Sequence, residues 1–263
     1  MRIVTWNVNS LKVRLPRVLE LLELHRPDVV CLQETKSAPD AFPVGELAAA
    51  GYGAVHASGG RWAGVALLAR AGLELVEPSL GLPGDPVPEE ARWCEATIGG
   101  IRYISVYAPN GRALDSPEFP RKLAFLDAAI ARVRELAPAQ SAARLVVAGD
   151  FNIAPADIDV YDPAAFVGST HVTPEERGRL QELLDAGLVD AYRRLHPTEV
   201  QYTWWDYRAG NFHKGLGLRI DLALVGLSLA ERLRHCGIDR NFRKGTKPSD
   251  HAPLLVDLAG AAR

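Results

Sequence analysis

Short apolar runs alternate with longer amphipathic stretches along this chain of 263 residues. Runs of about four to eight residues that are rich in branched and aromatic side chains, bounded by turn-forming residues, are typical of β-strands. We expect such strands at residues 2–7, 29–33, 53–56, 64–69, 93–98, 101–107, 145–149, 220–225 and 253–257. Many strands with longer stretches between them favour an α/β or layered α+β domain.

Three of the stretches between the strands have the pattern of surface helices, with apolar residues on one side only. The apolar face before Pro27 consists of Leu15, Val18, Leu19, Leu22 and Leu24. The apolar face before Pro138 consists of Leu123, Leu126, Ala129, Ile130 and Val133. A third helix is expected to begin after Thr173, a capping residue followed by Pro174, and to end at Gly187.

Two halves of the chain resemble each other. Residues 2–7 resemble residues 144–152, and residues 65–68 resemble residues 221–224. The long repeat indicates two similar sheets packed face to face, because solenoids repeat every 20 to 50 residues or so. No linker rich in Gly, Ser or Pro separates two cores, so we expect one domain, a sandwich with outer helices.

The formal net charge of −2 excludes a globally basic nucleic-acid binder. The charge is uneven, because residues 201–251 carry nine Lys and Arg against five Asp and Glu, or +4, which leaves −6 elsewhere. We expect this carboxy-terminal segment to face an anion, although a solvated helix face would have the same composition.

The distribution of cysteines and apolar residues predicts a cytoplasmic protein. The three cysteines, Cys31, Cys94 and Cys236, form no CxxC pair, and Cys31 lies in an apolar run where a thiol packs as a small hydrophobe. The chain begins without the apolar region of a signal peptide, and no run of 18 apolar residues follows. We expect no membrane partner.

Carboxylate, amide and imidazole side chains stand at the ends of the most apolar strands. These positions are Asn7, Glu34, Asp150, Asn152, Asp250 and His251. Taken singly, each could be a turn former, a helix cap or a surface residue. Asp221 differs, because it lies inside an apolar run, where a buried carboxylate needs a dedicated partner.

Several hard oxygen ligands at one edge of a sandwich favour Mg²⁺, with Mn²⁺ as a substitute. Zn²⁺ is disfavoured, because the seven histidines show no HExxH spacing and no cysteine cluster exists. Hydrolysis of a phosphodiester also needs an activated water and donors for the charge on phosphate.

The same residues supply candidates for these roles. Asp150 could accept the proton of a water that Asn152 holds, and His251, oriented by Asp221, could donate to a phosphate oxygen. Tyr107 could add a phenolic donor, or it could only pack its ring at a strand end.

Six short motifs stand in a fixed order: WNVNSL from Trp6, LQETK from Leu32, YAPNG from Tyr107, GDFNI from Gly149, LRID from Leu218 and SDH from Ser249. In this order they resemble the exonuclease III family of abasic-site endonucleases, within the endonuclease/exonuclease/phosphatase superfamily. The resemblance runs over residues 1–258, so we expect a single domain there and a short tail at 259–263.

The resemblance implies a four-layered α/β sandwich of two packed mixed sheets, of the kind seen in DNase I. It also implies a Mg²⁺-dependent repair nuclease that cleaves 5′ to abasic sites to leave a 3′-hydroxyl, digests double-stranded DNA from the 3′ end and trims 3′ ends. Its substrates would be duplexes with abasic sites or blocked 3′ ends, and we expect a monomer.

Roles carry over motif by motif. Glu34 would be the principal metal ligand, with Asn7 and Asp250 near the metal. Asp150 and Asn152 would position and activate water, Asp221 and His251 would form a dyad, and Tyr107 would contact the phosphate. Opinion on this family is divided between aspartate and histidine for the attacking water, and our interpretation assigns that role to Asp150.

Substrate contacts are also suggested by the resemblance. The segment WWDYR from Trp204 resembles the aromatic wall that accepts a flipped abasic sugar, with Trp204 in the pocket and Trp205 in the core. Lys12 and Arg14 would contact phosphates. Further contacts in two groove loops and beside the aromatic wall are expected from Asn110, Arg112, Arg208, Asn211 and Lys214.

Two alternatives remain beside this interpretation. A sphingomyelinase or inositol phosphatase of the same superfamily would share the sandwich and the final Asp-His pair, but LQETK and WWDYR are the DNA-repair versions of their motifs. A catalytically silent nucleic-acid-binding regulator would not need clustered carboxylates, which repel phosphate unless a cation intervenes. Hydrolysis of a choline or inositol phosphate would support the first, and Mg²⁺-independent DNA binding without cleavage would support the second.

Overall fold

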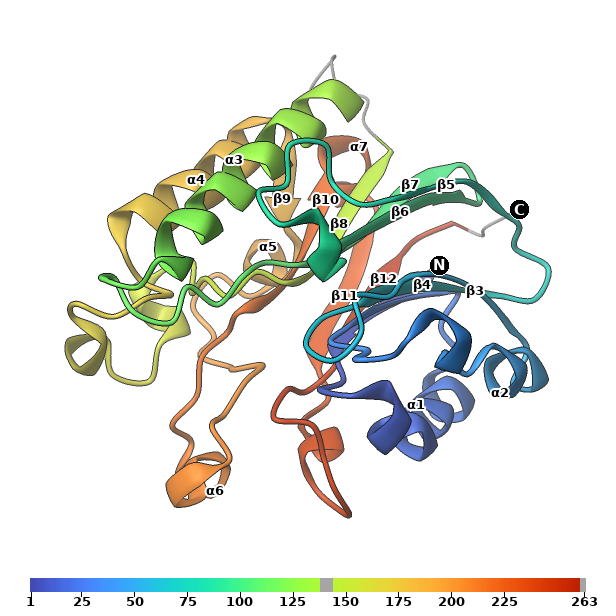
Figure 1. Cartoon of the computed structure of the whole chain (residues 1–263), viewed down its shortest axis with the longest axis horizontal. Coiled ribbons are helices and arrows are strands. Elements are labelled where there is room, and N and C mark those ends of the chain that lie inside the picture. Colours follow the sequence, from blue (N-terminus) through green and yellow to red (C-terminus); the bar gives the residue numbers. More distant parts are fainter. Residues whose placement is uncertain (138–143, 261–263) are drawn as a thin grey trace.

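The computed structural model describes residues 1–137 and 144–260, and it shows two six-stranded sheets packed face to face (Figure 1). The first sheet has the order β11-β12-β1-β2-β4-β3 and consists of β1 (Arg2–Asn7), β2 (Val29–Gln33), β3 (Tyr52–Ala57), β4 (Val65–Arg70), β11 (Leu233–Ile238) and β12 (Leu254–Leu258). The second has the order β5-β6-β7-β8-β10-β9 and consists of β5 (Leu75–Leu80), β6 (Trp93–Ile98), β7 (Ile101–Tyr107), β8 (Leu145–Asp150), β9 (Leu188–Asp190) and β10 (Asp221–Gly226).

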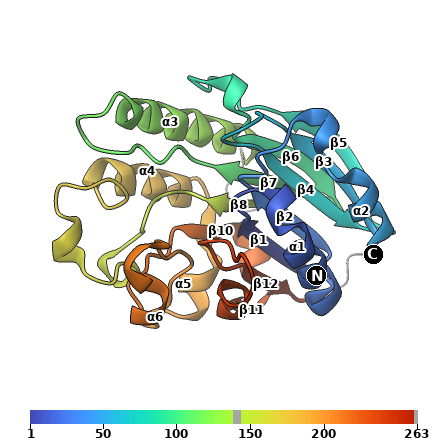
Figure 2. The ribbon, with the colours of Figure 1, turned by 60° about the horizontal axis from the view of Figure 1, so that its bottom comes forward.

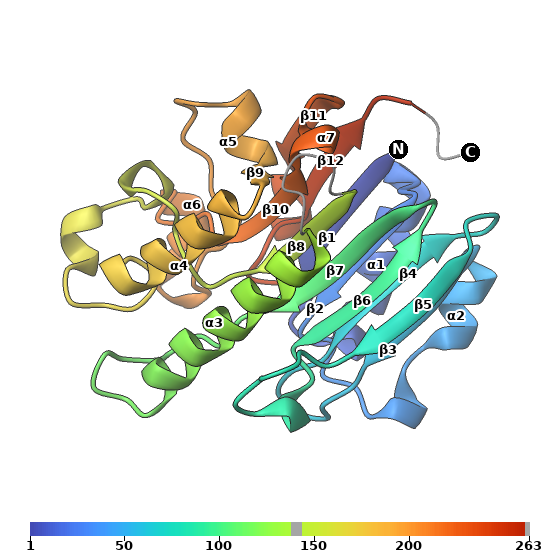
Figure 3. The ribbon, with the colours of Figure 1, turned by 90° about the horizontal axis from the view of Figure 1, so that it is seen from above.

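Helices cover both outer faces of the sandwich. The first sheet is covered by α1 (Leu11–His25) and α2 (Val44–Ala49), and the second by α3 (Glu118–Leu136) and α4 (Pro174–Asp185) (Figures 1 and 3). Shorter helices lie in the connections: α5 (Ala191–Leu195), α6 (Asn211–Lys214) and α7 (Leu227–Ala230). The expected four-layered α/β sandwich is confirmed.

Three apolar layers stabilise this arrangement. The layer between the sheets contains Cys31, Leu67, Tyr103 and Ala223, all buried. A second layer lies under α3 and α4, and a third under α1 and α2. Cys31, Cys94 and Cys236 are free and buried, as the sequence indicated for Cys31. Within residues 1–137 and 144–260, no helix is long and apolar enough to cross a membrane.

The two sheets share one pairing pattern. Each has one central parallel pair, β1 with β2 and β7 with β8, and its other neighbouring strands are antiparallel. In each sheet a helix connects the two parallel strands, α1 from β1 to β2 and α3 from β7 to β8, so β1 corresponds to β7 and β2 to β8. The second pair of similar segments is therefore confirmed, because β4 stands beside β2 as β10 stands beside β8. The first pair was wrong, because β1 is the first strand of its parallel pair and β8 is the second of its own.

The expected elements lie within a few residues of their predicted bounds, with two kinds of correction. Three strands were missed, β5, β9 and β11. In α1 the buried face includes Leu21, whereas Leu24 is 63% exposed, so that face was placed too far round the helix. Thr173 caps α4 and forms a capping box with Glu176. Pro138, the expected stop after α3, lies outside the described residues.

The strand register brings polar strand ends together. Asn7 pairs with Gln33 across the parallel β1–β2 pair, and Tyr107 pairs with Asp150 across β7–β8. Asp150 also faces Asp221 across β8–β10. Because the carboxyl ends of parallel strands meet at one edge of a sheet, both parallel pairs direct their last residues to the same end of the sandwich.

Candidate active site

Three side chains from three separate segments meet at this end of the sandwich. Glu34 follows β2, Asp150 ends β8, and His251 precedes β12. One ligand atom of each lies within 4.8 Å of the other two. Asp150 and His251 are buried and Glu34 is half-buried, so the cluster opens to solvent on the Glu34 side.

Asn7 holds the two carboxylates close to each other. Its amide Nδ2 donates to Glu34 Oε1 at 2.8 Å and to Asp150 Oδ2 at 2.9 Å. Its own Oδ1 accepts the backbone N–H of Asn9 at 3.0 Å. Like charges at this spacing repel, so an amide that donates to both reduces the cost of the pair.

The pKa of Asp150 is raised because burial disfavours its charged form, and His251 opposes that effect while Asp221 and Glu34 add to it. A buried cluster of carboxylates that raises a pKa in this way is a site where a bound cation would remove the repulsion. The carboxylates of Glu34 and Asp150 are hard oxygen donors that fit Mg²⁺ or Mn²⁺.

His251 and Asp221 form the dyad that the sequence suggested. Nδ1 of His251 lies 2.8 Å from Asp221 Oδ2, and Nε2 lies 3.8 Å from Asp150 Oδ2. Burial alone would lower the pKa of His251, but Asp221 and Asp150 outweigh it and raise the pKa to about 10. His251 is therefore a cation at neutral pH and donates Nδ1–H to Asp221.

Asn152 is fixed by hydrogen bonds on several sides. Its backbone N–H donates to Asp150 Oδ1 at 2.9 Å, and its Nδ2 donates to the carbonyl of Ala108 at 2.9 Å. Its Oδ1 accepts from Nδ2 of Asn110 at 3.2 Å. The backbone of Asn152 has a φ of 51°, a left-handed conformation that asparagine tolerates better than most residues.

Tyr107 directs its phenol toward Glu34. Burial, then Glu34, raises the pKa of Tyr107 well above its ordinary value, so the phenol stays protonated and can donate. The guanidinium of Arg92 lies 4.5 Å from the centre of the ring. Tyr107, Glu34, Asn110 and Arg112 line a common cavity of about 450 Å³.

Asp250 lies beside the tryptophan pair. Its Oδ2 accepts from Nε1 of Trp204 at 3.0 Å, and its Oδ1 accepts from Nδ2 of Asn9 at 3.0 Å. Trp204 is half-buried and Trp205 is fully buried. The two rings therefore have the opposite environments that strand alternation suggested.

The remaining expected substrate residues lie around the rim. Lys12 is exposed at the start of α1. The helix α6, which carries Asn211 and Lys214, projects from the body of the molecule in Figure 1 and comes forward in Figure 2. Arg208 is exposed and pairs with Asp206 through three hydrogen bonds.

Arg14 has a different environment from the one expected of a phosphate contact. Its guanidinium donates to the carbonyl of Asn9 at 2.5 Å, to Tyr207 Oη at 3.0 Å and to the carbonyl of Pro248 at 3.2 Å. Arg14 thus joins the start of α1 to two rim segments. The guanidinium N–H groups that make these hydrogen bonds would have to give them up in order to bind a phosphate.

Several residues that touch the site were not predicted from the sequence. Asn9 contacts Asp250, and Lys36 lies 2.7 Å from both Glu34 Oε2 and Asn9 Oδ1. Asn9 lies in the WNVNSL motif and Lys36 in the LQETK motif, so their place in these motifs was the sequence signal that could have indicated them. Lys122 binds the backbone carbonyl of Asn152 and pairs with Glu176. The sequence signal that could have indicated this pair is a lysine on an otherwise apolar helix face.

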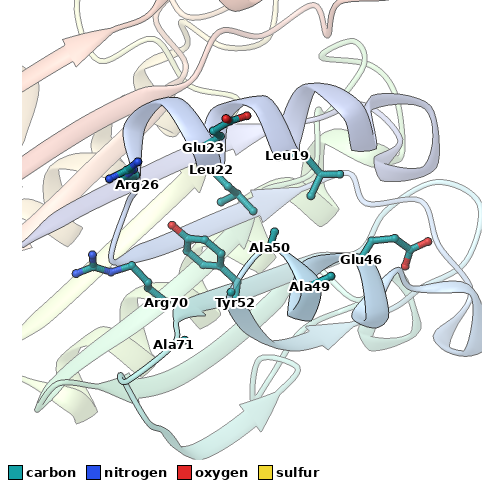
Figure 4. Close-up of a pocket in the computed structure, with 11 residues that line it drawn as sticks. Leu19, Leu22, Glu23, Arg26, Glu46, Ala49, Ala50, Tyr52, Arg70 and Ala71 are labelled. Carbon is teal, nitrogen blue, oxygen red and sulfur yellow. The ribbon is translucent and has the colours of Figure 1, made fainter.

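A larger cavity of about 640 Å³ lies elsewhere, between α1, α2 and β3 (Figure 4). Its lining includes Leu19, Leu22, Ala49 and Tyr52, with charged side chains at its rim. It contains none of the clustered residues Glu34, Asp150 and His251. Chemistry is therefore better placed in the smaller cavity beside Glu34.

Comparisons with known proteins agree with the motifs. Residues 4–251 match the model of the endonuclease/exonuclease/phosphatase family. The chain is 34% identical to exodeoxyribonuclease III of Haemophilus influenzae, over 98% of this chain and 100% of the relative. A solved 3′ phosphatase from Neisseria, NExo, bound to a product DNA hairpin, is 42% identical, with a TM-score of 0.95 over 99% of this chain and 100% of that one. An AP endonuclease from Archaeoglobus fulgidus is 34% identical, with a TM-score of 0.92 over 99% and 100% of the two chains.

Proposed function

The chain belongs to the endonuclease/exonuclease/phosphatase family and is an exonuclease III-type nuclease, and on that premise we propose that it is a Mg²⁺-dependent DNA repair enzyme. It hydrolyses the phosphodiester 5′ to abasic sites to leave a 3′-hydroxyl, and it removes nucleotides and blocking groups from the 3′ ends of double-stranded DNA. The observation that carries this proposal is the cluster of Glu34, Asp150 and His251 beside the Asp221 partner.

One bond unites these activities. Incision 5′ to an abasic site, removal of a 3′ nucleotide and removal of a 3′ phosphate all break the bond between phosphorus and a 3′ oxygen. Water supplies the new oxygen on phosphorus, and the 3′ oxygen leaves with a proton. A single site can therefore serve all three substrates if it accepts their different flanking groups.

Glu34 would hold the metal ion, with Asn7 and Asp250 beside it. A bound Mg²⁺ would neutralise charge on the phosphate oxygens, and Mn²⁺ would substitute for it. The raised pKa of Asp150 suits a group that accepts the proton of the attacking water, and Asn152 holds that water in place.

His251 and Tyr107 would act on the phosphate. The protonated His251, held by Asp221, presents Nε2 toward the reaction centre and donates a hydrogen bond to a nonbridging oxygen. The neutral phenol of Tyr107 donates a second one. Donors that are already fixed by buried partners need little reorganisation when charge develops.

Contacts to DNA would come from the rim. Trp204 would form the wall of a pocket for the abasic sugar, and Lys12 would contact phosphates. Groove contacts would come from Asn110, Arg112, Asn211 and Lys214, and Arg208 would contact DNA beside the aromatic wall. We expect Arg14 to help by holding the rim segments around Tyr207 and Pro248.

The three buried free thiols agree with a cytoplasmic location, and we expect a monomer whose domain spans residues 1–258.

A panel of substrates tests the proposal. We would incubate the protein with three labelled duplexes, one with a single abasic site, one with a 3′ phosphate and one with an undamaged recessed 3′ end, in Mg²⁺, Mn²⁺ or EDTA. We expect metal-dependent products that all end in a 3′-hydroxyl. DNA binding without cleavage would support a silent regulator instead, and hydrolysis confined to a choline or inositol phosphate ester would move the enzyme to another branch of the family.

A further inference from the structure

A buried ion pair lies directly behind the loops that carry Asn152 and Asn110. Lys122 stands on the apolar side of α3, in register with Phe125, Leu126 and Ala129, and its side chain has no exposed surface. Its ammonium pairs with Glu176 on α4, whose side chain is also fully buried. A buried charge costs free energy unless it is paired and hydrogen-bonded, so this lysine requires an explanation.

The ammonium of Lys122 is directed at the backbone of the site. Besides Glu176, it donates to the carbonyl of Asn152 at 2.7 Å and lies 3.2 Å from the carbonyl of Asn110. Thr170 Oγ1 lies 3.3 Å away. One cation thus contacts the loop after β8 and the loop after β7, and these are the two loops whose asparagine side chains bond to each other.

Glu176 is fixed by the segment that precedes α4. Its Oε1 accepts from Thr170 Oγ1 at 2.7 Å and from the backbone N–H of His171 at 2.9 Å. Its Oε2 accepts from Oγ1 of Thr173 at 2.8 Å and from the Thr173 N–H at 3.0 Å. A carboxylate with so many donors can hold an ammonium in one place.

Asn152 is consequently held by hydrogen bonds at both its backbone N–H and its backbone carbonyl. Asp150 accepts its N–H from the reaction side, while Lys122 and His171, the latter at 2.6 Å, bind its carbonyl from behind. The left-handed backbone of Asn152 persists because both of its peptide groups are held. Release of the carbonyl would let the residue turn, and its side-chain amide would leave the place where Ala108 and Asn110 hold it.

From this geometry we infer that Lys122 and Glu176 are positioning residues of the active site, which set the orientation of the Asn152 amide through its backbone carbonyl. The inference rests on the proposed function, since it assigns Asn152 to the attacking water. It predicts an effect on turnover beyond the loss of stability that the removal of any buried charge would cause, because a misplacement of about 1 Å can cost up to about a hundredfold in rate.

A matched control is a second buried carboxylate that pairs with a residue of α3. Glu95 on β6 is fully buried and pairs with Arg102 and with Arg132 of α3, but it contacts none of the site residues. Glu176→Gln and Glu95→Gln each neutralise a buried carboxylate that binds α3. Both should lower the melting temperature, and only Glu176→Gln should lower kcat.

The test is a double-mutant cycle with Asn152→Ala, measured on the full chain with Mg²⁺ at about 20 °C below the lowest melting temperature. We expect Glu176→Gln to lower kcat about tenfold or more with KM changed less than about twofold. In the Asn152→Ala background the same substitution should have almost no further effect, since the group through which it acts is gone.

The possible outcomes separate the inference about Lys122 and Glu176 from the proposed function. Equal kcat for Glu176→Gln and Glu95→Gln, or effects of Glu176→Gln that multiply with Asn152→Ala, would overturn the inference while leaving the proposed function intact. Inactivity of the wild-type chain on all three DNA substrates would overturn the proposed function and its positioning residues together. If Glu176→Gln does not fold, the neutral pair Lys122→Gln/Glu176→Gln keeps a hydrogen bond without buried charge and carries the same cycle.

Discussion

Three side chains at the end of the sandwich, Glu34, Asp150 and His251, are the candidates for the chemistry. An acid or amide directly after an apolar strand indicated Asn7, Glu34 and Asp150, and the acid inside a strand indicated that Asp221 needed a partner. The structure supplies that partner in His251, at 2.8 Å. It also shows what spacing along the chain could not, that Asn7 donates to Glu34 and Asp150 at once.

Removal of the Glu34 carboxylate should weaken metal use. In Glu34→Ala the Mg²⁺ concentration that gives half-maximal rate should rise by about tenfold or more, because the principal anionic ligand is lost. The measurement is a Mg²⁺ titration of the cleavage rate. Glu118→Ala is the control, since Glu118 lines the same cavity but pairs with Arg121. Equal titration curves for Glu34→Ala and wild type would remove Glu34 from the metal site.

Replacement of the dyad histidine should slow chemistry without loss of binding. We expect His251→Asn to lower kcat by about 10² or more, because a charged donor at the phosphate is lost, with the DNA dissociation constant nearly unchanged. Single-turnover kinetics and a binding titration in EDTA separate the two effects. His235→Asn removes an exposed histidine that lies 3.9 Å from Asp257 and serves as control. Full turnover in His251→Asn would contradict the role.

Secondary-structure elements were predictable where burial and periodicity agree. Central strands such as β2 and β8 are buried throughout and were found as continuous apolar runs. The missed strands lack that signal: β5 contains Pro78 and an irregular step at Glu77, β9 has only three residues, and β11 alternates irregularly beside a bulge. Edge strands pair on one side only, so their sequences are less constrained.

The pair β7–β8 depends on Gly149, for which the sequence indicated no role beyond its place in the GDFNI motif. A Cβ at Gly149 would lie 1.9 Å from the carbonyl oxygen of Val106, so an added methyl must push the two strands apart. We expect Gly149→Ala to lower the free energy of unfolding by about 1–3 kcal/mol and to reduce kcat, because Asp150 and Tyr107 end these strands.

Denaturant unfolding and initial rates measure both effects. Gly178→Ala is the matched control, since a Cβ there meets nothing within 4 Å on α4. In a helix this change should raise stability by up to about 1 kcal/mol and leave turnover unchanged. Wild-type stability and activity in Gly149→Ala would show that the strands tolerate the separation.

The sandwich joins two sheets that have the same strand-pairing pattern, and their parallel pairs end at the same place. Two hydrogen bonds cross the interface between the sheets just behind the cluster. Gln33 Nε2 donates to Ser105 Oγ at 3.0 Å, and Ser105 Oγ donates to the carbonyl of Leu32 at 2.9 Å. The repeat in the sequence indicated two sheets but misassigned one strand pair, since similarity of apolar runs does not specify neighbours.

DNA binding should depend on salt through local rather than net charge. The chain is slightly acidic overall, so affinity must come from rim cations such as Lys12. Lys12→Ala should weaken binding and reduce the slope of log affinity against log salt by about 1, as measured by titrations at several salt concentrations. Arg26→Ala, at the opposite end of α1, is the control. An identical slope for Lys12→Ala and wild type would exclude a phosphate contact.

Metal-dependent incision is tested by a comparison of wild type with Asp150→Asn on a duplex that carries one abasic site, with Mg²⁺ or with EDTA, with the products resolved by length and 3′ end group. We expect wild type with Mg²⁺ to cut immediately 5′ to the abasic site and leave a 3′-hydroxyl, and we expect the variant and the EDTA reaction to cut at least about 10²-fold more slowly. Undiminished incision by Asp150→Asn, or in EDTA, would contradict a metal-dependent hydrolysis centred on Glu34, Asp150 and His251.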